Sequence, residues 1–342
     1  MPTPSVSVIV VNYDRNELLA ACLRSLEAQT YADFEAIVVD NGSTDSSHET
    51  LAAAETKGVL VIRNPENRGF CAANNQGLAV ARGRWVALLN NDAEAEPQWL
   101  AELLAAADGR QGCGMAASKI LSWEDPSVID KVGHLIYPDG QNRGRGTGET
   151  DRGQYDATQE ALWPDGCAAL YRREMLEQIG GFDEDFFAYA DDAELGLRAR
   201  IAGWSCVYAP KAVVRHHVGS TLGRYSELRL FLIERNRVWL ATKLFPAGMV
   251  LRAPFYFGLR LAATAWAALR GRGEGARATH TVGAYGLLKC VIRANWAALR
   301  GTPAMLRKRR EIENFRKLSP AETAALLRLY RIRLSELTSR AS

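Results

Sequence analysis

Apolar and polar positions follow two different periods along the first hundred residues. Short apolar stretches rich in β-branched side chains predict four strands, over residues 5–11, 34–39, 59–63 and 85–90. Between them, apolar side chains recur at helical spacing over residues 17–29 and 70–81. The turn at residues 41–45 leads into another helix, with Ser43 or Thr44 as its N-cap. Strands that alternate with helices predict an α/β fold with a mostly parallel, Rossmann-like sheet.

The middle of the chain is less regular. Residues 137–160 are rich in Gly, Asp, Arg and Gln, and they predict a mobile loop, of the kind that often serves as a lid. Residues 191–202 predict a helix that stops at Gly203, followed by two short strands over 205–209 and 212–214.

The C-terminal part is helical, aromatic and basic. Residues 224–317 contain 19 Lys and Arg against 5 Asp and Glu, whereas the rest of the chain is net acidic. The longest apolar run, residues 261–269, is far shorter than the roughly 20 residues of a membrane span. We predict a first domain over residues 1–225 and a basic helical region over 226–342. Amphipathic helices on an anionic membrane surface are one interpretation, and an ordinary helical subdomain is the other.

Composition narrows the class further. The 342 residues are 47% hydrophobic and 24% charged, which is typical of a globular protein. Six cysteines without a CxxC pair predict reduced, buried thiols rather than disulfides or a zinc site. We expect a cytoplasmic protein, because the opening residues do not resemble a secretory segment. Nucleic acid is not expected as a partner, because no recognition motif accompanies the basic charge.

The fourth strand ends in Asn90, Asn91 and Asp92. Ligands of open α/β sheets bind at the carboxyl ends of strands. A carboxylate flanked by amides there suits a hard divalent cation that takes its other ligands from phosphate and water. The alternative is that Asp92 or Glu94 caps the helix that Pro97 helps to start.

Two further features lie near predicted strand and helix ends. Asp40 ends the second strand, where its carboxylate can accept a hydrogen bond from a ribose or a base. Capping of the following turn is the alternative. Asn67 and Arg68 precede a helix N-terminus, where backbone N–H groups and the guanidinium can hold phosphate.

Asp191 and Asp192 begin a predicted helix after an aromatic run. One of the pair can act as a general base, because adjacent carboxylates raise each other's pKa. The alternative is helix capping with an ion pair to Arg198. His216 follows the last short strand and can complete a metal shell or contact a diphosphate, or it can be structural.

Taken in order, these motifs resemble the family 2 glycosyltransferases of the GT-A fold, and most closely bacterial rhamnosyltransferase-type enzymes of cell-surface polysaccharide assembly. The resemblance spans roughly residues 5–245, including Arg235-Asn236-Arg237. The matching segments are residues 7–13, 38–45, 67–70 with Asn74-Asn75, 89–92, 180–187 with Asp191-Asp192, and His216 with 219–221.

The resemblance implies a role for each matching residue. It places Asn12, Tyr13 and Asp40 in the nucleotide pocket, together with Asn67, Arg68 and Asn91. It makes Asp92 a ligand of Mg²⁺ or Mn²⁺, with His216 near the metal and diphosphate. It makes Asp192 the catalytic base, with Asp191 beside it. Asn90 replaces the first acid of the family's DXD motif, which leaves Asp92 as its one carboxylate.

The expected function is inverting sugar transfer from a nucleoside diphosphate sugar, with dTDP-L-rhamnose favoured. The expected acceptor is a polyprenyl-linked saccharide or polysaccharide at the inner face of the cell membrane. Nucleotidyl transfer is a rival, although a glycine-rich loop does not follow the first strand. A domain that only binds sugar nucleotide or recruits partners is the other rival.

Overall fold

The computed structural model describes residues 3–217, 226–270 and 273–339. Its N-terminal half is the expected alternation. The strands are β1 (Val6–Asn12), β2 (Phe34–Asp40), β3 (Leu60–Arg63) and β4 (Trp85–Leu89), and they pair in parallel in the order β4-β1-β2-β3. The intervening helices are α1 (Asn16–Glu27), α2 (Ser47–Thr56) and α3 (Gly69–Val80), and α4 (Trp99–Ala107) follows. The predicted α/β fold, with a mostly parallel sheet flanked by helices, is confirmed.

Alternate residues of each strand enter different cores on the two faces of this sheet. Val8 and Val10 of β1 pack with Leu19 of α1 and Leu51 of α2 on one face. Ile9 packs on the other face, with residues of α3, α5 (Arg173–Ile179) and α6 (Asp191–Ile201). This period-two pattern is what a sheet covered by helices on both faces requires.

The other half of the sheet is mixed. It adds β6 (Cys113–Ser122), β11 (Ala168–Arg172), β10 (Gln159–Ala161) and β12 (Ser205–His216), in the order β10-β12-β6-β11-β4. The strand β11 is antiparallel to both β4 and β6. The two short strands expected at 205–209 and 212–214 form a single strand, β12. An irregularity between Ala209 and Val213 interrupts its pairing with β6, and this interruption explains the apparent break in the pattern.

Residues 137–160 form a loop for most of their length, as predicted, and two short strands interrupt it. A hairpin joins β8 (His134–Ile136) to β9 (Asn142–Gly144), and β10 begins at Gln159. The polar residues have partners within the protein. Lys119, which is buried, pairs with Asp151 at 2.7 Å and with Asp156 at 2.5 Å. Low apolar content here reflects satisfied polar contacts rather than disorder.

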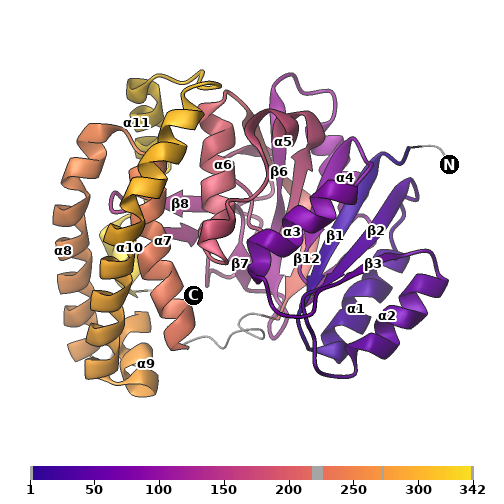
Figure 1. Ribbon diagram of the computed structural model, residues 1–342, viewed down its shortest axis with the longest axis horizontal. Coiled ribbons are helices and arrows are strands. Elements are labelled where there is room, and N and C mark those ends of the chain that lie inside the picture. The colour runs from indigo at the N-terminus through magenta and orange to yellow at the C-terminus, as the bar shows by residue number, and fades with distance from the viewer. Residues whose placement is uncertain (1–2, 218–225, 271–272, 340–342) are drawn as a thin grey trace.

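The C-terminal helices pack beside α6 and not as a separate layer on the parallel strands (Figure 1). They are α7 (Glu227–Leu244), α8 (Ala247–Leu269), α9 (Gly273–Val282), α10 (Ala284–Ile312), α11 (Pro320–Leu329) and α12 (Leu334–Ser339). The core that contains Ile9 also contains Trp239 of α7 and Met305 of α10. Within the described residues, no helix is both long and apolar enough to cross a membrane.

Candidate active site

The cluster after β4 does not cap a helix. The N–H of Asn90 donates to the Cys167 carbonyl at 2.8 Å, and Asn91 donates through Nδ2 to Oδ1 of Asn12 at 2.8 Å. Asp92 is buried, and β5 (Ala93–Ala95) follows it directly. The helix α4 begins at Trp99, with Gln98 before it, so neither Asp92 nor Glu94 lies at its N-terminus.

His216 lies beside Asp92 because β12 and β5 are paired in a register that sets His216 opposite Ala93. Its Nε2 is 3.4 Å from Oδ1 of Asp92, and its Nδ1 is 2.8 Å from Oδ2 of Asp130. Burial alone would lower the pKa of His216, but Cys167, Asp130 and Asp92 raise it well above its usual value. A metal-binding histidine usually has its other ring nitrogen held by a carboxylate or a carbonyl, as Asp130 holds Nδ1 of His216.

The ends of β1 and β2 are joined to this cluster by side-chain hydrogen bonds. Nδ2 of Asn12 donates to Oδ1 of Asp40 at 3.2 Å and to Oγ of Ser43 at 3.0 Å. The Ser43 hydroxyl also accepts from the N–H of Asp14 at 2.8 Å. Ser46, and neither Ser43 nor Thr44, precedes α2. Asp40 is therefore connected through Asn12 to Asn91, while Tyr13 beside them is half-buried.

Asn67 and Arg68 lie ahead of α3, where they are exposed. Oδ1 of Asn67 accepts from the N–H of Gly69 and from Nδ2 of Asn41, each at 2.9 Å. The N–H of Arg68 donates to Oδ1 of Asn41 at 3.1 Å. The backbone N–H groups of Arg68 and Gly69 are thus used within the protein, whereas the side chain of Arg68 is exposed.

Asp191 and Asp192 are both buried at the start of α6. Oδ1 of Asp192 accepts from the N–H of Ala193 at 2.7 Å, and Oδ2 accepts from the N–H of Gly166 at 3.3 Å. Arg198 pairs with Glu194 at 2.8 Å, which removes the alternative that it pairs with the aspartates. Burial raises the pKa of both carboxyl groups, and Asp192 raises that of Asp191 further.

The turn before Asp191 has an unusual backbone. Phe187, Tyr189 and Ala190 all have left-handed φ angles, of 65°, 66° and 56°. Left-handed non-glycine residues cost free energy and persist only where the surroundings hold them. Asn236 of α7 does so, because its Nδ2 donates to the carbonyls of Phe186, Ala188 and Tyr189 at 2.7–3.0 Å.

Four buried or half-buried polar residues that the sequence analysis did not single out connect the two halves of the site. They are Asp130, Lys131, His134 and Asp165. Asp130 and Lys131 belong to β7 (Ile129–Lys131), which pairs with β6. The signal available in the sequence was a charged pair set between apolar Ile129 and Val132.

Together with Asp92, His216 and Asp192, these residues form an unbroken series of ionisable side chains, which we call the charged chain. Lys131 Nζ is 3.7 Å from Asp130 and 2.9 Å from Oδ2 of Asp165. Asp165 is 2.8 Å from Nε2 of His134, and that nitrogen is 3.4 Å from Oδ2 of Asp192. The charged chain consists, in order, of Asp92, His216, Asp130, Lys131, Asp165, His134 and Asp192.

One end of this chain has metal-ligand spacing. The donor atoms of His134, Asp165 and Asp192 lie within 4.8 Å of one another. The ammonium of Lys131 already supplies positive charge to that group, 2.9 Å from Asp165, and it holds the pKa of Asp165 well below its usual value despite burial. Because a lysine already fills this electrostatic role there, we propose Asp92 and His216, at the other end of the chain, as the cation site.

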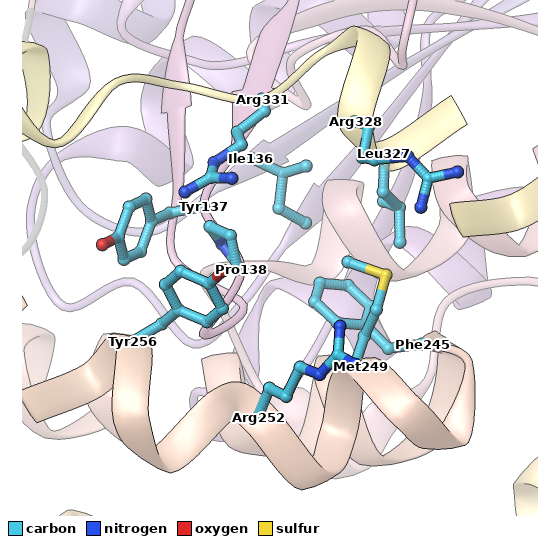
Figure 2. Close-up of a pocket in the computed structure, with 10 residues that line it drawn as sticks. All are labelled: Ile136, Tyr137, Pro138, Phe245, Met249, Arg252, Tyr256, Leu327, Arg328 and Arg331. Atoms are coloured by element: carbon cyan, nitrogen blue, oxygen red, sulfur yellow. The ribbon is translucent and has the colours of Figure 1, made fainter. Parts of the chain in front are cut away.

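A separate pocket opens beside α8 and shares no residue with this site. Figure 2 shows Arg252, Arg328 and Arg331 around it, with Tyr137 and Tyr256 forming part of its wall.

Comparison with known proteins agrees with this geometry. The family model described as Glycosyl transferase family 2 matches residues 7–180, and the one described as Glycosyl transferase family group 2 matches residues 148–282. The fold is the GT-A fold, which two solved glycosyltransferase structures share. The chain belongs to glycosyl transferase family 2.

Curated relatives come from several bacteria. The O-antigen biosynthesis protein RfbC of Myxococcus xanthus is 34% identical over 226 residues, which cover 63% of this chain and 17% of that protein. The uncharacterized protein y4gI of Sinorhizobium fredii is 33% identical, over 65% of this chain and 25% of that protein. The chain thus spans a quarter or less of these two relatives. An N-acetylglucosaminyl-diphospho-decaprenol L-rhamnosyltransferase of Mycobacterium tuberculosis is 27% identical, over 69% of this chain and 87% of that protein.

Two solved structures share the fold at low sequence identity. GalNAc-T7 with UDP, GalNAc and Mn²⁺ superposes with a TM-score of 0.58 and 15% identity, over 72% of this chain and 49% of that one. The mannosyltransferase PcManGT of Pyrobaculum calidifontis, in complex with GDP-Man and Mn²⁺, superposes with a TM-score of 0.51 and 20% identity. The match covers 95% of this chain and 86% of that one. At such identities the likeness shows the fold alone.

Proposed function

We propose that this chain is an inverting, metal-dependent glycosyltransferase of polysaccharide assembly. It moves a sugar from a nucleoside diphosphate donor to an acceptor hydroxyl. The observation that carries the proposal is the buried charged chain. It connects a cation-binding pair, Asp92 and His216, to a carboxylate with a raised pKa, Asp192. Sugar transfer from a nucleotide requires both kinds of group in one site.

Asp92 and His216 would hold Mg²⁺ or Mn²⁺. Asp130 orients His216 so that Nε2 faces Asp92. When bound, the cation would offset the negative charge that develops on the departing diphosphate. With one carboxylate and one imidazole from the protein, its remaining ligands come from diphosphate oxygens and water.

The donor nucleotide binds along the ends of β1 and β2. Asp40 accepts a hydrogen bond from the base or ribose. Hydrogen bonds through Asn12 and Asn91 fix the position of that carboxylate relative to Asp92. Tyr13 lines the same edge. Asn67 shapes the turn that presents Arg68, whose exposed guanidinium contacts a phosphate oxygen.

Asp192 removes the proton from the acceptor hydroxyl while that oxygen bonds to the anomeric carbon. The bond from this carbon to the diphosphate breaks on the opposite face, and its electron pair leaves with the diphosphate oxygen. A single displacement of this kind inverts the anomeric configuration. Burial raises the pKa of Asp192, which suits proton removal near neutral pH.

The relatives guide the choice of substrates. The mycobacterial relative carries the name of an L-rhamnosyltransferase that acts on a lipid-linked sugar, and RfbC that of an O-antigen protein. We therefore favour dTDP-L-rhamnose or another deoxyhexose donor, and a polyprenyl-linked or polysaccharide acceptor. Residues 1–225 would form the catalytic domain and 226–342 the helical region that meets the membrane.

The outer faces of α8 and α10 support a cytoplasmic membrane surface as a partner. Exposed apolar side chains recur along α8 and α10 at helical spacing. They include Leu251, Phe255, Leu259, Trp266, Leu269, Tyr285, Leu288, Ile292, Trp296 and Leu299. Arg270 lies over the Trp266 ring at 4.3 Å, and Arg300 over Trp296 at 5.3 Å. Basic side chains stacked on tryptophan fit an interface with anionic lipid headgroups.

A panel of nucleotide sugars tests the proposal. The expected donor raises the melting temperature of the protein, and more strongly with Mn²⁺. That donor should then support transfer to a lipid-linked saccharide, with an inverted anomeric centre by NMR. Asp192→Asn should bind the donor and transfer nothing. Asp125→Asn makes the same change on an exposed aspartate outside the charged chain, so it serves as the matched control and should keep full activity.

The rival functions give different outcomes. A nucleotidyltransferase would release pyrophosphate from a nucleoside triphosphate. A recruitment domain would bind a donor without turnover even in the unaltered protein. Either result overturns the proposal.

A further inference from the structure

Asp191 and Asp192 are adjacent and both buried, but different groups face them. The pKa of Asp191 is raised by burial and by the like charges of Asp192 and Asp165. For Asp192, burial and Asp165 raise the pKa, while His134 and Lys131 lower it in part. The two carboxyl groups therefore do not compete equally for a proton.

The geometry of His134 accounts for this difference. Its Nε2 lies between two carboxylates, 2.8 Å from Oδ2 of Asp165 and 3.4 Å from Oδ2 of Asp192. Because that nitrogen faces two acceptors, it carries the proton. The ring stacks on Trp163, with centroids 5.8 Å apart and planes at 22°, and only 5% of the residue is exposed. His134 thus has one fixed orientation, and it presents an N–H to Asp192.

Lys131 and Asp165 hold His134 from the opposite side. Asp165 accepts from Nζ of Lys131 at 2.9 Å and from the N–H of Cys167 at 2.9 Å, in addition to His134. With these donors Asp165 stays ionised, and its pKa is well below its usual value although burial opposes this. An ionised Asp165 keeps the proton of His134 on Nε2.

We propose that His134 is a positioning residue that selects Asp192, and not Asp191, as the carboxylate that takes the acceptor proton. The inference rests on the proposed glycosyltransferase function and deepens it. Lys131 and Asp165 act through His134. Asp191 remains the protonated member of the pair.

Several elements bring titratable groups up to Asp192, and a test of pH dependence has to consider all of them. They are Asp191 on α6, Asp165 before β11, Lys131 on β7, His134 on β8 and Tyr171 on β11. Burial raises the pKa of Tyr171 well above its usual value, so its hydroxyl stays neutral across the relevant range.

The test uses two substitutions of the same residue. His134→Phe keeps a ring against Trp163 but removes the N–H, whereas His134→Gln keeps a donor near the position of Nε2. We expect His134→Phe to lower kcat about 10- to 100-fold with the donor KM unchanged. The acidic limb of its pH profile should move to higher pH, because Asp192 loses a group that lowers its pKa. His134→Gln should recover most of the rate.

A matched pair of lysine substitutions separates this effect from general loss of a buried charge. Lys131→Met should shift the same limb in the same direction. Lys119→Met also removes a lysine paired with two aspartates, but this lysine is not part of the charged chain. This variant should leave the acidic limb of the pH profile in place. Equal shifts for the two lysine variants would overturn the inference, as would an unshifted limb in His134→Phe.

A measurement without turnover keeps this inference distinct from the proposed function. Carboxyl groups labelled with ¹³C at aspartate report ionisation by NMR in the full chain. Asp192 should titrate at lower pH than Asp191 in the unaltered protein, and the gap should narrow in His134→Phe. If no donor is turned over but this pattern holds, the proposed function fails and the pairing of His134 with Asp192 stands. If the gap does not change, the inference fails even in an active enzyme.

Discussion

The side-chain amide of Asn236 donates to the backbone carbonyl of Tyr189 across 2.7 Å, two residues before the first aspartate of α6. The same amide faces the carbonyls of Phe186 and Ala188. A helix from the C-terminal region therefore holds the left-handed turn that sets the position of the proposed base.

Replacing Asn236 should disturb stability and activity together. Asn236→Asp puts carboxylate oxygens against three carbonyls, so the turn loses its donor in a fully buried place. We expect the free energy of unfolding to fall by about 1–3 kcal/mol and kcat to fall with it. Urea denaturation and transfer assays check this. Asn314→Asp, on an exposed asparagine, should change neither, and equal effects of the two variants would contradict the role of the turn.

Gly69 tests the contact between α3 and the same turn. Its φ is +86°, and a Cβ there would lie 2.5 Å from the ring of Phe187. Gly58 has a φ of +88° and open space around it. Both alanine variants carry the cost of the left-handed backbone, about 1 kcal/mol, so the additional loss in Gly69→Ala measures the Phe187 contact. We expect a lower melting temperature for Gly69→Ala than for Gly58→Ala. The same melting temperature in both would show that the ring moves freely aside.

Asp130 should control metal affinity without touching the metal. Asp130→Asn weakens the hold on Nδ1 of His216, so Mn²⁺ binding in the presence of a nucleoside diphosphate should weaken by about 10- to 100-fold. Isothermal titration calorimetry measures this directly. Asp125→Asn alters an exposed aspartate outside the charged chain and is again the control. Unchanged Mn²⁺ affinity in Asp130→Asn would argue against His216 as a ligand.

Glu234 gives the clearest pH dependence of stability. Burial alone would raise its pKa, but Arg260 and Arg237 outweigh burial and lower the pKa to about 2. A group whose pKa is depressed on folding stabilises the protein above the pKa of its unfolded form, near 4.3. That contribution is lost as the pH falls toward 2.

Glu234→Gln should therefore be less stable than the unaltered protein at pH 7, by about 3 kcal/mol. The difference should shrink as the pH is lowered from about 4.5 toward 2. Unfolding by urea at several pH values measures it. Glu313→Gln, whose partner Arg316 lies just beyond the end of α10, is the control and should show almost no difference at any pH. A constant gap for Glu234→Gln would exclude the ion pairs as its cause.

The outer face of α8 should control binding to anionic vesicles. Replacing Leu251 and Phe255 by serine removes two of its most exposed apolar side chains, at 82% and 66% exposure. Flotation with phosphatidylglycerol vesicles should fall, and vesicles of phosphatidylcholine alone should bind weakly from the start. Leu60→Ser changes an exposed leucine on β3 as a control. Unchanged flotation of the double variant would remove the membrane from the proposal.

The first half of the fold could be predicted from the sequence because β1, β2 and β3 are each followed by a helix. β1 to β4 were predicted to within one residue at each end. The second half could not, because its order depends on pairing between distant segments. β11 lies between β4 and β6 although β6 comes earlier in the chain, and no local period records that.

The site divides in the same way. Asn90 to Asp92 and Asp191 to Asp192 stand at strand and helix ends, where a pattern can be recognised. His134 and Asp165 lie 31 residues apart, on either side of a stretch that resembled a loop, and they meet only because β8 and the segment before β11 fold together. The buried cysteines were expected correctly, and all six are free and buried.

The core shared by Ile9, Trp239 and Met305 has a consequence for anyone who cuts or recombines this chain. A fragment ending near residue 225 would expose that core and would also lose Asn236. Chimeras that exchange the C-terminal helices between relatives would need to bring compatible partners for Asp183 and Glu194, both of which pair with Lys243. The C-terminal helices and the turn that carries the proposed base therefore have to be exchanged as one unit.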